Sequence, residues 1–126
     1  MSRKVIETKN APAAIGPYSQ AVVSGQTVFV SGQIPINPEN GELVEGDITA
    51  QSHQVMKNLK AVLEAAGTGF DKVIKMQIFL KDMDDFGAVN EVYGSYLSQP
   101  YPARACVEVA RLPKNVAVEI DAIANI

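Results

Sequence analysis

An arginine and a glutamate interrupt two apolar segments near the end of the chain, at positions that a strand usually devotes to packing. Arg104 stands within residues 102–109 and Glu119 within residues 118–121, and both segments have the composition of β-strands. A guanidinium binds a carboxylate through two parallel hydrogen bonds, and a carboxylate can hold a water molecule and accept its proton. If both side chains lie on one face of one sheet, the pair suits a small carboxylate substrate and a catalytic water.

Each of these residues also has a purely structural interpretation. Arg104 could form an ion pair with Glu108, Glu119 or Asp121, and Glu119 could simply be its partner. A neighbouring cation lowers the pKa of a carboxyl group whereas burial raises it, so the two effects on Glu119 oppose each other. The pattern alone leaves both interpretations open.

Four further residues are weaker candidates. Cys106 lies two residues beyond Arg104, hence on the same face of a strand. A nucleophilic cysteine needs a base, and the only histidine, His53, is expected to face solvent, so Cys106 is expected to pack against a ligand. The others are Tyr18 in a loop, Gly32 at a strand end and Asn90 on a helix; residues in such places are more often a packing ring, a simple turn and a surface amide.

Composition and missing motifs exclude several classes of protein. The 126 residues suit one domain, residues 1–126, and 47% hydrophobic with 20% charged residues is ordinary for a globular protein. A net charge of −3 disfavours nucleic-acid binding. One cysteine and one histidine offer no zinc site, and no nucleotide-binding loop or serine-hydrolase elbow occurs. We expect no metal, no cofactor, no signal peptide, no membrane segment, and a cytoplasmic location.

Two helices and a set of strands must position the candidate residues. Apolar residues recur at helical spacing after Asp47, a plausible N-cap, until Gly67 ends that helix. A second helix begins at Asp84 and runs to about residue 97. The predicted strands cover residues 3–8, 19–24, 27–31, 34–36, 43–44, 72–80, 102–109 and 118–121. This order predicts an α+β fold in which both helices pack on one face of a mixed β-sheet.

The alternation of side chains along the strands assigns the two faces. The face beneath the helices is predicted to carry Ile74, Met76, Ile78, Leu80, Val118 and Ile120. The opposite face is predicted to carry Lys75, Gln77, Phe79, Arg104, Cys106, Glu119 and Asp121. That face is either solvated or an oligomer interface with a polar cleft. We favour the interface, because Val73, Phe79 and Cys106 would otherwise lie in water.

Several segments together resemble the RidA family, also called YjgF or reactive intermediate deaminase A. They are residues 13–21 (AAIGPYSQA), 30–35 (VSGQIP), 58–63 (NLKAVL), 90–93 (NEVY), 102–113 (PARACVEVARLP) and 118–120 (VEI). The resemblance extends over nearly the whole chain, and its C-terminal signature is long.

The resemblance implies a chorismate-mutase-like fold, a homotrimer, and ligand clefts between subunits. It implies a cofactor-independent deaminase that hydrolyses 2-iminopropanoate and 2-iminobutanoate to 2-oxo acids and ammonia, which removes reactive imine and enamine intermediates. By resemblance, Arg104 would bind the substrate carboxylate and Glu119 would hold the attacking water. The cleft would be lined by Tyr18, Gly32 and Cys106, and completed from across a subunit boundary by Phe86 and Asn90.

Two other functions stay open. Some relatives carry an endoribonuclease label, although the acidic net charge and the single histidine weigh against RNA cleavage. A non-enzymatic module that binds 2-oxo acids or a regulatory partner would need Arg104 but not a water held by Glu119.

Overall fold

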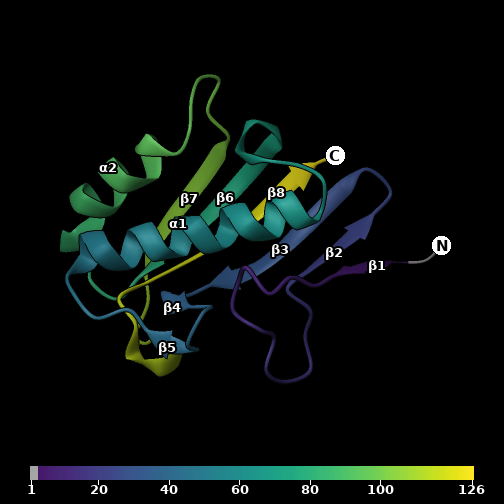
Figure 1. Ribbon diagram of the computed structural model, residues 1–126. Coiled ribbons are helices and arrows are strands. Elements are labelled where there is room, and N and C mark those ends of the chain that lie inside the picture. Colours follow the sequence, from purple (N-terminus) through teal and green to yellow (C-terminus); the bar gives the residue numbers. More distant parts are fainter. Residues whose placement is uncertain (1–2) are drawn as a thin grey trace.

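The computed structural model describes residues 3–126; residues 1–2, at the start of the segment in which we expect no signal peptide, lie outside that range. Both helices pack on the same face of a six-stranded sheet, which we call the covered face (Figure 1). A two-stranded hairpin forms a second, small sheet. Within residues 3–126, no helix is long and apolar enough to cross a membrane.

The sheet is mixed and its strand order differs from the chain order. The helices are α1 (Ile48–Ala65) and α2 (Phe86–Ser95), and the strands are β1 (Lys4–Ile6), β2 (Ala21–Ser24), β3 (Thr27–Gln33), β4 (Ile36–Asn37), β5 (Glu42–Leu43), β6 (Val73–Leu80), β7 (Ala103–Glu108) and β8 (Val118–Asn125). The large sheet runs β1-β2-β3-β8-β6-β7. Among the strands of residues 3–126, only β6 and β7 pair in parallel. The predicted α+β fold is therefore confirmed.

Local chemistry sets both ends of α1. The Asp47 carboxylate accepts a hydrogen bond from the Ala50 N–H at 3.0 Å, which caps the first turn. Gly67 adopts a positive φ of 83°, and the Thr68 N–H donates to the Leu63 carbonyl at 3.0 Å. Between these ends, α1 buries an apolar stripe against the covered face: Val55, Met56, Leu59, Val62 and Leu63.

A β-bulge changes one predicted face. The pairing of β6 with β8 shifts its register between Val73 and Lys75. Val73 is consequently buried in the core at 7% exposure, whereas Ile74 is 46% exposed. The prediction that Ile74 packs beneath the helices is therefore wrong, because the extra residue of a bulge reverses the alternation on one side of it.

The other side of the sheet, which we call the open face, carries no helix and mixes polar with apolar residues. Phe79 pairs with Glu119 and Gln77 pairs with Asp121 across β6 and β8, so these four residues share a face, as predicted. The exposed apolar side chains of this face include Val5, Phe29 and Val107. An apolar group of this kind, interleaved with carboxylates, is a feature that a second protein surface would cover.

Candidate functional site

The register of the edge strand β7 decides where Arg104 points. Arg104 pairs with Met76 of β6, and Met76 is fully buried beneath the helices. Glu119 pairs with Phe79, three residues further along β6. Since successive side chains of a strand alternate between faces, Arg104 lies on the covered face and Glu119 on the open face.

The prediction that Arg104 and Cys106 share the open face with Glu119 is therefore wrong. β7 and β8 are not neighbours, because β6 lies between them. The face of each strand depends on its pairing with β6, and a shift of one residue moves every side chain to the other face. Within a single chain, the guanidinium and the carboxylate cannot meet in one cleft.

Arg104 is held by residues of α2. Its Nη1 donates a hydrogen bond to the Asn90 Oδ1. Its guanidinium carbon lies 5.3 Å from the ring centre of Phe86 and 5.1 Å from that of Tyr93. Such cation–π contacts contribute about 0.5–1 kcal/mol each at exposed sites. Because the bond to Asn90 uses one of five N–H donors, the fixed guanidinium keeps donors for a bidentate ligand.

These contacts also correct the expected origin of two residues. Phe86 and Asn90 were expected to reach the site from across a subunit boundary, but both lie beside Arg104 in the same chain. Tyr93 also contacts Arg104, and it was not among the predicted site residues. Its position three residues after Asn90 is the signal that could have found it, since residues so spaced share a helix face.

Cys106 is poorly suited to nucleophilic catalysis. Burial raises the pKa of its thiol, and the nearby Arg104 lowers it to a smaller extent. The thiol is therefore protonated at neutral pH, whereas the reactive species is the thiolate. His53 was expected to face solvent, but the structure contradicts this. The side chain is half-buried, and its Nδ1 lies 3.0 Å from the Tyr96 hydroxyl.

Glu119 and Gly32 form a second cluster on the open face. A β-carbon built on Gly32 would lie 2.8 Å from the Cδ of Glu119, so only glycine allows the carboxylate this position. The pairing of β3 with β8 is irregular between Val30 and Gln33, which brings Gly32 to the carboxylate. Burial, and to a smaller extent the charge of Asp121, raises the pKa of Glu119. The carboxylate is thus a better proton acceptor than an exposed one.

Tyr18 lies apart from the contacts of Arg104, near the strand that carries Gly32. It ends a loop that the buried side chain of Gln20 fastens to the sheet. The Gln20 amide hydrogen-bonds to the backbone of Thr8, Ala11 and Pro12 at 2.7–3.3 Å. Tyr18 and Ser31, the neighbour of Gly32, line the same cavity of about 580 Å³. The predicted site residues therefore form two groups, one of Arg104, Cys106, Asn90 and Phe86 and the other of Glu119 and Gly32, and Tyr18 lies near the second group through Ser31.

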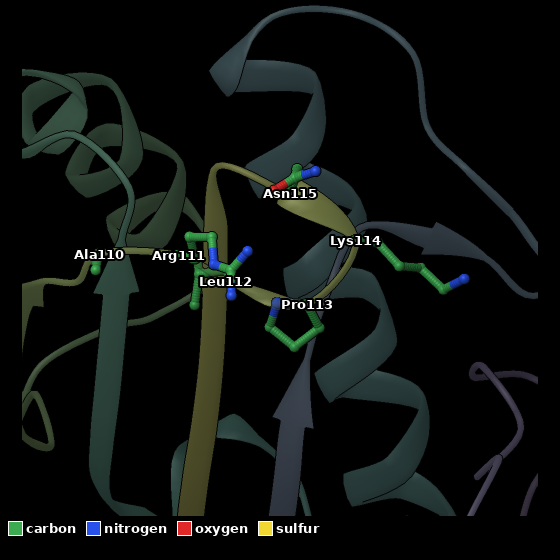
Figure 2. Close-up of a pocket in the computed structure, with 6 residues that line it drawn as sticks. All are labelled: Ala110, Arg111, Leu112, Pro113, Lys114 and Asn115. Carbon is green, nitrogen blue, oxygen red and sulfur yellow. The ribbon is translucent and has the colours of Figure 1, made fainter.

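A separate hollow of about 640 Å³ lies inside the loop between β7 and β8. Figure 2 shows its lining side chains, with Lys114 directed away from the loop. It contains none of the predicted site residues and is formed by the curvature of the loop, where Lys114 and Asn115 have positive φ. In residues 3–126, no three His, Cys, Asp or Glu side chains gather where they could hold a metal ion.

Tyr93 offers a test of what orients Arg104. Within the described chain its buried hydroxyl has no hydrogen-bond partner, and an unsatisfied buried polar group costs about 1–3 kcal/mol. We expect Tyr93→Phe to leave the thermal midpoint unchanged or raise it, because the ring beneath the guanidinium remains. Tyr93→Leu, which removes the ring, should weaken carboxylate binding. A loss of stability in Tyr93→Phe, measured by calorimetry, would show that the hydroxyl is satisfied.

Comparison with known proteins places the chain in a family. The sequence model named Endoribonuclease L-PSP matches residues 8–126. A mouse protein named 2-iminobutanoate/2-iminopropanoate deaminase is 51% identical, over 97% of this chain and 90% of its own. The protein of the same name from Escherichia coli K12 is also 51% identical, over 96% of both chains.

Solved structures agree with the sequence comparison. The crystal structure of RidA from an Antarctic Psychrobacter species has a TM-score of 0.94 and 51% identity, and covers 98% of this chain and 99% of its own. The structure of Escherichia coli TdcF with bound serine has a TM-score of 0.93 and 48% identity, and covers 98% of each chain. The fold, the sequence model and these relatives agree, and the chain belongs to the Rid family, also known as the L-PSP family.

Proposed function

We propose that this protein is a cofactor-independent deaminase that hydrolyses 2-imino acids, such as 2-iminopropanoate and 2-iminobutanoate, to 2-oxo acids and ammonia. The observation that carries the proposal is the guanidinium of Arg104, which is held by Asn90 and lies over two aromatic rings at the edge of a cavity. Relatives that share half of its residues over nearly their whole length are named for this reaction.

Arg104 would bind the carboxylate that every 2-imino acid carries. A fixed guanidinium matches a carboxylate through two parallel hydrogen bonds, and charged hydrogen bonds contribute about 1.5–3 kcal/mol each. The structure of the relative TdcF contains serine, a small amino acid with the same carboxylate. Cys106 would line the site beside the bound carboxylate.

Glu119 would hold the water that attacks the imine carbon. The water oxygen bonds to the carbon of the protonated imine as the C=N π electrons move to nitrogen, and Glu119 accepts the proton that the water loses. The carboxyl group then returns this proton to the nitrogen. The C–N bond breaks as the hydroxyl oxygen forms the C=O bond, and Glu119 takes the hydroxyl proton and passes it to the departing ammonia, so ammonium leaves and the 2-oxo acid remains. An imine carbon is already electrophilic, so positioning supplies much of the rate.

Two copies of the chain must meet to complete this site, because Arg104 and Glu119 lie on opposite faces of one sheet. We propose a homotrimer in which Arg104, Asn90 and Phe86 of one subunit face Glu119, Gly32 and Tyr18 of the next. The exposed apolar side chains of the open face support an interface there, since monomers rarely leave such groups uncovered. Glu119 and Asp121, the carboxylates of the open face, would lie in the cleft between the subunits.

A coupled assay tests the proposed activity. An amino-acid oxidase converts alanine to 2-iminopropanoate, and the rate at which the imine disappears is followed with and without the protein. We expect the protein to accelerate hydrolysis well beyond the spontaneous rate. Binding of 2-oxo acids without any acceleration would favour the non-enzymatic module instead. Cleavage of RNA that disappears in Arg104→Ala would favour the ribonuclease. The contact of His53 with the Tyr96 hydroxyl does not support that function.

The pH dependence of hydrolysis should report the Glu119 carboxyl group. Only its ionised form accepts a proton, so the rate should rise with pH through its pKa. Burial and the charge of Asp121 raise this pKa within one chain, and Arg104 of the facing subunit would lower it, so the position of the acid limb reports the balance of these effects. Asp121→Asn removes the smaller of the two causes and should move the acid limb to lower pH. An acid limb that Asp121→Asn leaves in place would assign the titration to another group.

A further inference from the structure

The carboxylate of Glu108 fastens the start of α2 to the edge strand β7. Its Oε1 accepts a hydrogen bond from the Met83 N–H at 2.8 Å, across 25 residues of chain. Met83 opens the 3₁₀ turn Met83–Asp85, and this turn leads directly into Phe86, the first residue of α2. Glu108 is the last residue of β7, where that strand pairs with Leu80 of β6. The contact therefore joins the point at which α2 begins to the point at which β7 ends.

Packing in the core fixes the later part of α2 more firmly than its first turn. Within the described chain, the side chain of Asp85, the residue before the helix, makes no capping hydrogen bond. Phe86 is half-buried, and the fully buried residues of α2 all lie beyond its first turn: Val89, Val92 and Tyr93. The position of Phe86 therefore depends on the turn that Glu108 fastens.

A second contact joins the same helix and strand. Arg104 lies four residues before Glu108, so both side chains leave β7 on the covered face, and Arg104 donates a hydrogen bond to Asn90 of α2. Four strand residues span about 13 Å. The chain from Met83 to Asn90 spans roughly 10–12 Å as a 3₁₀ turn followed by α-helix. The two spacings match, so α2 can lie along β7 with both contacts made at once.

We propose that Glu108 is a positioning residue for imine hydrolysis: it holds the first turn of α2 on β7, so that α2 keeps the Arg104 guanidinium in the orientation that binds the substrate carboxylate. The inference rests on the proposed function, because it takes Arg104 as the group that binds this carboxylate. The ring centre of Phe86 lies 5.3 Å from the guanidinium carbon. A displacement of the first turn would therefore move one of the surfaces on which the guanidinium lies.

Glu108→Ala is expected to raise KM for 2-iminopropanoate about 10-fold with a smaller change in kcat, since a carboxylate held less firmly throughout the reaction chiefly weakens binding. The direction separates positioning from charge. Through charge alone, loss of a carboxylate near Arg104 would favour an anionic substrate and lower KM. Glu108→Gln keeps an oxygen that can accept the Met83 N–H, so its KM should return most of the way to the wild-type value. Because Glu108 is exposed, both variants should fold, which circular dichroism checks.

Asp84→Asn is the matched control, because it removes a negative charge from the same turn while its backbone N–H can still donate to the Asp82 carboxylate. It should keep the wild-type KM. A second measurement introduces Glu108→Ala into a protein that already carries Asn90→Ala. There α2 no longer hydrogen-bonds to the guanidinium, so Glu108→Ala should raise KM much less than it does in the wild type. A general loss of stability would act equally in both backgrounds.

Four results would overturn the inference. Glu108→Ala could keep or lower the wild-type KM, Glu108→Gln could raise KM as much as Glu108→Ala, Asp84→Asn could raise it equally, or Asn90→Ala could leave the effect of Glu108→Ala undiminished. Each of these is measured on a wild-type protein that hydrolyses 2-iminopropanoate, so each leaves the proposed function standing. A wild-type protein that does not hydrolyse this imine would overturn the proposed function, and the role of Glu108 with it.

Discussion

Arg104→Ala is expected to lower kcat/KM for 2-iminopropanoate by more than about 100-fold, while the protein remains folded and assembled. The substitution removes the group that would fix the substrate carboxylate, and losses of this size follow when a substrate is no longer held in its reactive position. Because the Arg104 side chain is exposed, its removal should leave the core intact. The coupled imine assay gives the rate, and circular dichroism and gel filtration report the fold and the assembly.

Two further variants separate geometry from charge. Arg104→Lys keeps the positive charge but loses the planar fork that pairs with Asn90 and a carboxylate, so its rate should fall between those of the wild type and Arg104→Ala. Arg111→Ala removes an exposed arginine of the β7–β8 loop, which contains none of the predicted site residues, and should retain the wild-type rate. Wild-type turnover by Arg104→Ala would refute the role of the guanidinium.

Mixing two inactive variants is expected to restore activity. Arg104→Ala retains Glu119, and Glu119→Gln retains Arg104, so a site shared between a chain of each kind can contain both groups. If equal amounts assemble at random, each required group is intact with a chance of one half. About one quarter of the sites should therefore recover, because each neighbouring pair in a symmetric ring contributes one site. The variants are unfolded together, refolded and assayed.

The control for mixing combines Arg104→Ala with the double variant that carries both substitutions. No chain in that mixture has Arg104, so it should stay inactive, which excludes a general effect of refolding. Mixed assemblies can be detected by mass spectrometry if one variant is isotopically labelled. Mixed assemblies without any recovery of activity would mean that one site does not draw Arg104 and Glu119 from different chains.

The elements of the fold were largely predictable because their signals are local. Asp47 and Gly67 mark the ends of α1 through capping chemistry that involves only a few neighbouring residues. The alternation of β6 was equally legible from Lys75 onward, where Met76 and Ile78 are buried and Gln77 and Phe79 face the other way. Only the bulge at Ile74 escaped, since it arises from the pairing with β8 and not from the residues of β6 alone.

Of the two residues proposed for the site, Glu119 lies on the predicted open face, whereas Arg104 lies on the face opposite to the predicted one. Arg104 and Glu119 were chosen because charged residues in apolar strands are unusual. Their faces depend on two pairings, that of β7 with β6 and that of β8 with β6. No local signal in residues 102–109 fixes the first pairing, because β7 is an edge strand that is exposed along most of its length. Sequence reasoning therefore could not predict the face of Arg104, and the roles of both residues stay predictions.

The opposite placement of Arg104 and Glu119 has a consequence for how the protein behaves when it is scarce. Under the proposed arrangement, a single folded chain is inactive, because its Arg104 has no Glu119 of another chain opposite it and its Glu119 has no Arg104. Dilution would silence the reaction without unfolding anything, and a chain that lacks one half would also spoil one of its neighbour's sites. Catalysis would then be a property of the assembly, set by cellular abundance as much as by the groups themselves.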